Sequence, residues 1–292
     1  MGRRRRTRIA FLTAAAVLAV AAGLVEYAPH VVALAQQPKH RAAPATADPT
    51  PPDDWNRKGT YLGAGQAYPS VVRLLASDGT PTCSGTVVHS PGGDIVITAA
   101  HCVFADGSYN TGLSVAPGTT GGSNPHGTWQ VDRIWVDPHY TDNHDEDYDY
   151  AFLRVTRSDG TRIEDAVGAN TLVTNLPYHL TSVTTTGYPD DDNPGDAQLT
   201  CAMDVYRSPA QPNYREMHCD GYTTGVSGGP WVLLKPGART GELVGIVGGF
   251  NGGGPSDDDP HTNAISYSPY FTAATKSLLA EAVAGQGGQA GH

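Results

Sequence analysis

Residues 224–230 of the chain read TGVSGGP, and the sequence continues as WVLL over residues 231–234. Glycines on both sides of a serine allow a sharp turn in which backbone N–H groups point together into a cavity, which is what an oxyanion needs. The apolar residues that follow favour a strand. A Gly-x-Ser-Gly-Gly stretch taken alone is often only a turn, so Ser227 is at this point a candidate nucleophile.

Two further segments carry candidate catalytic side chains. Residues 97–102 read ITAAHC, an apolar strand that ends in small residues and then His101. A histidine held in place is a good general base because its pKa lies near working pH. Residues 147–155 read DYDYAFLRV, with acidic residues at the mouth of an apolar strand. Each segment also has an ordinary interpretation, as a structural histidine or as a solvated or calcium-binding loop. The order His, Asp, Ser in one chain favours a catalytic triad.

The composition predicts a loop-rich β protein. The 292 residues include 35 glycines and 22 prolines, too many for a helical bundle. After residue 57 short apolar runs alternate with turn residues, which is typical of an all-β domain. A helix is predicted only over residues 271–283, where Ala, Leu and Lys favour it. The clearest expected strands cover residues 70–75, 82–89, 94–98, 129–136, 150–156, 182–186, 231–234 and 242–250.

The first 56 residues differ from the rest. A basic start, an apolar run over residues 9–25 and small residues at Ala33 and Ala35 predict a signal peptide over residues 1–35, and therefore a secreted protein. The apolar run could also stay uncleaved as a membrane anchor, and the twin arginines leave a twin-arginine export route open. Residues 36–56 are rich in Ala, Pro, Thr and Asp, which predicts a disordered pro-segment or linker.

The charge excludes several kinds of partner. The chain has a formal net charge of −10, although its first 41 residues are basic. An acidic domain is repelled by phosphate backbones and anionic lipid headgroups, so we expect no nucleic-acid binding and no membrane binding after signal cleavage. The acidic stretches at residues 190–192 and 257–259 lack a full calcium-loop pattern, and we interpret them as solvated turns. We expect no cofactor, no metal and a monomer.

Four cysteines in an exported chain predict two disulfides. Three pairings are open. The local one joins Cys83 to Cys102 and Cys201 to Cys219, and each of its loops would stabilise the fold by roughly 3 kcal/mol. A metal site is disfavoured because the sequence has no Cys-x-x-Cys pair.

The three segments, continued by LVGIV at residues 243–247, resemble those of secreted chymotrypsin-like serine peptidases of the bacterial type, over about residues 66–284. The resemblance implies an all-β fold of two packed six-stranded antiparallel β-barrels with a C-terminal α-helix, all within residues 57–292. The first barrel would cover about residues 66–160, the second about 175–268. The active site would lie in the cleft between them.

The resemblance also implies a role for each residue. Ser227 would attack the peptide carbonyl, His101 would take its proton, and Asp149 would hold the imidazole. Asp149 is chosen over Asp147 and Asp145 because it alone has alanine two residues later, as in the family pattern. The N–H groups of Gly225 and Ser227 would bind the oxyanion.

Two departures from the family bear on activation and support of the site. Val226 stands where many members have an aspartate that pairs with a newly freed amino terminus, so that switch should be absent. Gly248 stands where many members have a serine that supports the catalytic aspartate.

Specificity is expected to depend on two segments. By resemblance, Gly248, Gly249 and Phe250 would pair with the substrate backbone, and Gly221 would lie near the pocket floor. Gly221 brings no charge, which disfavours cleavage after Lys or Arg unless Asp220 turns inward. Glutamate-specific relatives have a histidine at the position of Val247. We therefore expect small or medium apolar side chains, with Phe250 at the pocket rim.

Two other functions fit parts of the sequence. An inactive homologue could bind a partner protein while retaining these motifs. The serine motif also fits the nucleophile elbow of α/β-hydrolase esterases, but that elbow precedes a helix, whereas residues 230–234 predict a strand.

Overall fold

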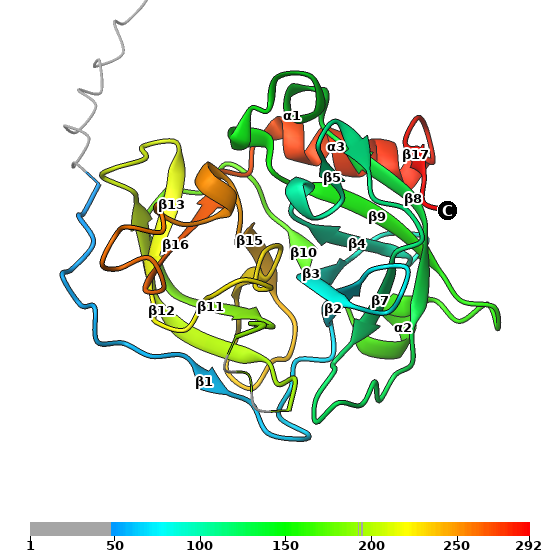
Figure 1. Ribbon diagram of the computed structural model, residues 1–292, viewed down its shortest axis with the longest axis horizontal. Coiled ribbons are helices and arrows are strands. Elements are labelled where there is room, and N and C mark those ends of the chain that lie inside the picture. The colour runs from blue at the N-terminus through cyan, green and yellow to red at the C-terminus, as the bar shows by residue number, and fades with distance from the viewer. Residues whose placement is uncertain (1–47, 192, 194) are drawn as a thin grey trace, which may run out of the picture. The chain divides into compact units, whose positions relative to one another are not determined.

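The computed structural model describes residues 48–292 apart from residues 192 and 194, so the predicted signal peptide lies outside the described residues. The first half forms a closed antiparallel barrel, with strands in the order β8-β7-β2-β3-β4-β9 and a further pairing of β8 with β9 (Figure 1). Val, Ile and Leu side chains, together with aromatic ones, form its core. The six strands are β2 (Val71–Leu75), β3 (Pro81–Val88), β4 (Ile95–Thr98), β7 (Ser114–Pro117), β8 (Trp129–Val136) and β9 (Ala151–Thr156).

The second half forms a curled sheet in the order β15-β14-β11-β12-β13-β16. Its end strands form no ladder in the described part of the chain, but the N–H of Ile246 donates to Ser268 Oγ at 3.1 Å and that of Gly248 to the Tyr267 carbonyl at 3.1 Å. The sheet is thus a half-barrel. Its strands are β11 (Leu180–Gly187), β12 (Leu199–Arg207), β13 (Tyr214–His218), β14 (Pro230–Leu233), β15 (Glu242–Ile246) and β16 (Ile265–Pro269), with β10 (Thr171–Leu172) beside β15 and β1 (Thr60–Tyr61) beside β12.

The predicted two-barrel, chymotrypsin-like fold is confirmed, with the second barrel only partly closed. The other elements are short, apart from one helix. They are η1 (Ala100–Cys102), β5 (Phe104–Ala105), β6 (Ser108–Tyr109), α1 (Pro138–Asn143), η2 (Glu146–Tyr148), α2 (Ile163–Val167), η3 (Phe250–Gly252), α3 (Ala273–Ala284) and β17 (Gln289–Ala290).

The C-terminal helix α3 returns to the first barrel. The Thr272 side chain accepts from the backbone N–H of Ala274 at 3.1 Å, and the backbone N–H of Thr272 donates to Thr275 Oγ1 at 3.1 Å, which is a capping-box arrangement. Leu278 and Ala282 are buried in the core of the first barrel. The strand β17 then pairs with β8 (Figure 1). Segments far apart in sequence therefore complete the first barrel.

Both disulfides are local. Cys83 bonds Cys102 across a separation of 19 residues, and Cys201 bonds Cys219 across 18, with Cα atoms 6.2 and 6.6 Å apart. The first joins β3 to η1, and the second joins β12 to the residue after β13. Of the three possible pairings, the chain forms the local one.

Residues 48–62, here named the N-terminal strap, lie along the second sheet. Trp55 stacks between His218 and His261, with ring centroids 4.3 and 4.0 Å away, and β1 extends the sheet beside β12. Residues 48–56 of the predicted disordered pro-segment or linker thus have defined contacts, and residues 36–47 of that segment lie outside the described residues. The contacts depend on Trp55, an aromatic anchor in a stretch that is otherwise polar. No helix in the described ranges is both long and apolar enough to span a membrane.

Candidate active site

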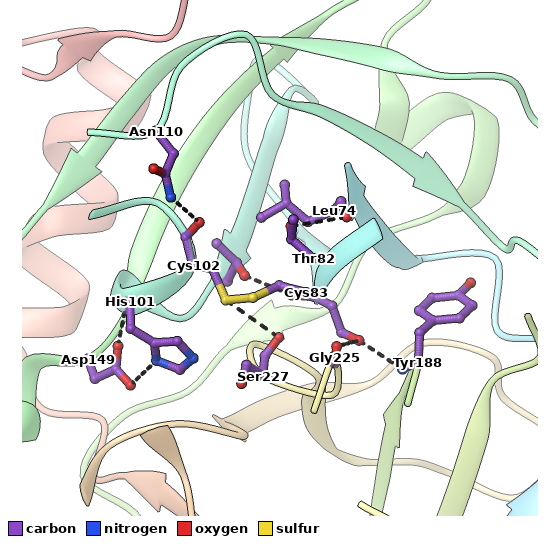
Figure 2. Close-up of a disulfide and its surroundings, with 12 residues drawn as sticks. Leu74, Thr82, Cys83, His101, Cys102, Asn110, Asp149, Tyr188, Gly225 and Ser227 are labelled. Atoms are coloured by element: carbon purple, nitrogen blue, oxygen red, sulfur yellow. Dashed lines mark hydrogen bonds and ion pairs between the residues drawn. A yellow bond between two sulfur atoms is a disulfide. The ribbon is translucent and has the colours of Figure 1, made fainter. Parts of the chain in front are cut away.

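Adjacent strands bring His101 and Asp149 together. β4 ends at Thr98, two fully buried alanines follow, and His101 stands in the short helix η1. Asp149 lies two residues before β9 begins at Ala151, and Thr98 pairs with Ala151. The Nδ1–H of His101 donates to Asp149 Oδ2 at 2.8 Å (Figure 2). The small side chains of Ala99 and Ala100 allow the chain to turn directly after the strand, so that His101 lies near its end.

The carboxylate of Asp149 is buried and accepts two more hydrogen bonds. The backbone N–H of His101 donates to Oδ1 at 2.9 Å, and the backbone N–H of Gly249 donates to Oδ2 at 2.7 Å. Burial raises the pKa of Asp149, but the charge of His101 and these hydrogen bonds outweigh burial and lower the pKa. Gly249 N–H thus supports the carboxylate where many family members use a serine at the position of Gly248.

The environment of His101 favours the imidazolium. Burial lowers the pKa of His101, but the charge of Asp149 and its hydrogen bond outweigh burial and raise the pKa above its ordinary value. Because Nδ1 donates to Asp149, the neutral ring carries its lone pair on Nε2. Nε2 is therefore the nitrogen that is available to accept a proton.

Ser227 lies in the loop that joins β13 to β14, and this loop contacts β3 of the first barrel. The N–H of Ser84 donates to the carbonyl of Ser227 at 2.8 Å. A side chain at Gly228, where φ is +80°, would collide with the Ser84 carbonyl and with Thr98 Oγ1, so only glycine allows this approach. Sγ of Cys102 lies 3.9 Å from the Ser227 carbonyl, a contact rather than a hydrogen bond, since a disulfide sulfur carries no hydrogen. Figure 2 shows the His101 ring between Asp149 and Ser227.

The peptide groups around Gly225 have a defined orientation. The N–H of Asp190 donates to the Thr224 carbonyl at 2.8 Å, and Ser84 Oγ donates to the Gly225 carbonyl at 2.9 Å. In a trans peptide the N–H points opposite to the C=O, so the N–H of Gly225 points away from Asp190. Among the described residues no acceptor contacts the N–H of Gly225 or of Ser227. Both donors are thus free for a ligand oxygen.

His101 and Ser227 line one cleft, of about 240 Å³. Its apolar walls include Val226, Val247 and Ile265, and Asp257 is the single carboxylate among its described lining residues. The remaining lining residues are Tyr222, Thr223, Thr224, Asn251, Gly252, Gly253, Gly254, Pro255, Thr262, Asn263 and Ser266.

The predicted specificity residues lie beside this cleft and do not line it. Gly221 packs on Leu199, and the neighbouring Asp220 has its carboxylate 3.7 Å from Lys58 Nζ in the strap. Gly248 lies against Asp149, and Gly249 against the ring of Tyr214.

Phe250, predicted at the pocket rim, packs on Tyr267 with ring centroids 6.3 Å apart. The cleft wall includes residues 251–255 together with Thr262, Asn263, Ile265 and Ser266, which no sequence motif marked.

The site offers no set of metal ligands. In residues 48–292, with the two gaps given above, one cluster brings three potential ligand side chains together, and it consists of Cys83, His101 and Cys102. Both sulfurs belong to a disulfide and cannot act as thiolate ligands, which leaves one histidine.

Comparison with known proteins agrees with this architecture. The first matched structure is the protease Anisep from Arthrobacter nicotinovorans (TM-score 0.65, 23% identity, 75% of this chain and 97% of the other). A Glu endopeptidase structure matches with a TM-score of 0.62 and 22% identity, over 78% of this chain and 98% of the other. At these identities the likeness concerns the fold.

Sequence comparisons define the family. An extracellular metalloprotease of Bacillus subtilis (strain 168) is 29% identical over 121 residues, which are 41% of this chain and 37% of that relative. The match therefore spans little more than a third of the relative's length. The Trypsin family model matches residues 58–271, most of the chain and both sheets. The chain belongs to the trypsin family.

Proposed function

We propose that the protein is a secreted endopeptidase that hydrolyses proteins or peptides through Ser227, His101 and Asp149. One observation carries the proposal: the imidazole that is bound by Asp149 at 2.8 Å opens on the same cleft as Ser227. The family and fold support peptide-bond hydrolysis. The predicted signal peptide and the extracellular relative support secretion.

The proposed reaction follows from the protonation states. Ser227 Oγ attacks the substrate carbonyl while Nε2 of His101 accepts its proton, and Asp149 keeps the ring in the tautomer with Nε2 free. The N–H groups of Gly225 and Ser227 stabilise the oxyanion, at about 3 to 4 kcal/mol per donor in comparable sites. His101 then protonates the leaving amine. Water then attacks the acyl carbon while His101 accepts its proton, and His101 returns a proton to Ser227 Oγ as the product acid leaves.

The cleft supports a preference for uncharged side chains at the cleaved position. Asp220 is paired with Lys58 rather than directed into the cleft, and Asp257, the one carboxylate among the described lining residues, is exposed to solvent. Val226, Val247 and Ile265 provide apolar walls. A peptide-library profile led by small or medium apolar residues is expected, and a profile dominated by Arg, Lys or Glu would contradict it.

Covalent labelling tests the proposed nucleophile. The purified domain should react with a fluorophosphonate and hydrolyse peptides, whereas Ser227→Ala should do neither, with turnover lower by a factor on the order of 10⁶. A folded parent protein that neither reacts nor hydrolyses would instead be an inactive homologue that binds a partner. Activity of Ser227→Ala within tenfold of the parent would identify another nucleophile.

A further inference from the structure

The loop that carries the oxyanion donors lacks the internal anchor typical of its family. Val226 is 3% exposed and packs in the core of the second sheet near Val183 and Trp231, so it offers no charge to hold the loop. The N–H of Gly225 is useful only if its peptide keeps one orientation, because an oxyanion donor must be aimed before the reaction begins. Some other group has to fix that peptide.

Asp190 meets this requirement from two directions. Its backbone N–H holds the Thr224 carbonyl at 2.8 Å, which fixes the orientation of the Gly225 N–H. Its carboxyl lies against the α-carbon of Gly225, since a Cβ built there would be 2.7 Å from Asp190 Cγ. Both contacts depend on where the short segment around Asp190 lies.

Arg73 fixes Asp190 from the other half of the molecule. Arg73 lies on β2 of the first barrel and is only 5% exposed. Its Nη2 is 3.1 Å from Asp190 Oδ1, its Nη1 is 2.6 Å from Asp196 Oδ1, and its guanidinium lies 5.7 Å from the centre of the Tyr188 ring. A buried guanidinium with two carboxylate partners has little freedom to move.

We propose that Arg73 and Asp190 are positioning residues for the oxyanion-binding loop, an ion pair between the two halves that orients the Gly225 N–H. The inference rests on the proposed function. It implies that the loop is ordered before any cut near the amino terminus, because neither residue depends on a freed α-amino group. Neither side chain is assigned a contact with substrate.

The test compares Asp190→Asn with Asp196→Asn. Both changes remove one carboxylate charge from Arg73 and preserve side-chain shape, but only Asp190 contacts the loop at Gly225. Asp190→Asn should lower kcat by a factor on the order of 10 to 100 with KM little changed, because the oxyanion forms only after binding. Asp196→Asn should stay within about twofold of the parent in kcat.

A transition-state analogue separates positioning from general destabilisation. Affinity for a peptide boronate or aldehyde, which places an oxygen among the oxyanion donors, should fall with kcat in Asp190→Asn. Affinity for the matching peptide carboxamide should not change. If Asp190→Asn fails to fold, Arg73→Lys, which keeps the charge and loses the fork geometry, should show the same selective loss.

The outcomes distinguish the two proposals. A parent protein that labels with fluorophosphonate, together with an Asp190→Asn variant of equal kcat and analogue affinity, overturns the positioning role and leaves the proposed function intact. Equal losses in the two asparagine variants also overturn it. A folded parent that does not label overturns the proposed function itself.

Discussion

The protonation state of His101 is expected to make the rate of peptide hydrolysis depend on pH. Burial lowers the pKa of His101, Asp149 raises it by more, and the net direction is upward from about 6.5. Only the neutral ring can accept the serine proton, so kcat/KM should fall as pH drops through a value above 6.5. A pH profile of peptide hydrolysis measures this limb, and a midpoint below 6 would contradict the assignment.

The raised pKa of His101 also affects the free energy of unfolding, whose pH dependence is opposite to that of activity. The pKa of His101 is higher in the folded chain than in the unfolded one, so its contribution is fully present below the unfolded value and is lost as pH rises through the folded value. We therefore expect the highest activity at the pH values where His101 contributes least to stability.

Gly225 has no room for a side chain. A Cβ there would lie 2.6 Å from the Tyr188 carbonyl, and φ is +94°. Gly225→Ala should therefore cost about 1 to 3 kcal/mol in the free energy of unfolding and lower kcat by a factor on the order of 100. Urea unfolding and initial rates measure both effects.

Gly237→Ala is the matched control. Gly237 has φ of +78° and no atom within 4 Å of the added Cβ, so that variant has the backbone strain without the collision. It should lose about 1 kcal/mol and keep full activity. Equal kcat losses in the two variants would contradict the steric argument.

Side-chain chemistry pointed to His101, Asp149 and Ser227, but the groups around them left no sequence signal. The support for Asp149 comes from the backbone N–H of Gly249, and any residue except proline has such a group. Ser84 Oγ, which accepts from the Tyr188 N–H at 2.8 Å, is one serine among many until the fold places it. Contacts made by generic groups become visible only in three dimensions.

At the scale of elements, the two disulfides allow a paired comparison. They close loops of nearly equal length, so Cys83→Ala/Cys102→Ala and Cys201→Ala/Cys219→Ala should each lose about 3 kcal/mol of stability. Only the first disulfide includes Cys102, which is next to His101 in the sequence and contacts the Ser227 carbonyl. Its loss should also lower kcat, measured well below the unfolding temperature, and equal kcat in the two double variants would contradict this.

The elements differ in how clearly the sequence marks them. In the first barrel the strands are runs of apolar residues. The strands predicted over residues 94–98 and 150–156 correspond to β4 and β9. The sequence did not predict β12, in which buried residues alternate with more exposed ones. It did not predict β13 either, because that strand buries the charged residues Arg215 and Glu216. Tertiary partners stabilise these charges, since Arg215 donates to four backbone carbonyls.

At the scale of the whole molecule, the strap is expected to stabilise the second sheet. Trp55→Ala removes the stacking on His218 and His261 and should lower the free energy of unfolding by about 2 kcal/mol, with faster proteolysis of residues 48–62. Asp54→Ala breaks an exposed ion pair with Arg57 and should change stability by no more than about 0.5 kcal/mol. Equal stability of the two variants would contradict an anchoring role.

The return of α3 and β17 to the first barrel affects how the polypeptide folds as it is made. Trp135 on β8 donates its Nε1–H to the Gln286 carbonyl at 2.7 Å, and β17 pairs with β8 some 150 residues earlier in the chain. A nascent chain that has emerged only through β9 lacks these partners, so an early-folding half would expose apolar surface where Leu278 later packs. Nearly all of residues 48–292 therefore have to leave the ribosome before the first barrel is fully protected from proteolysis.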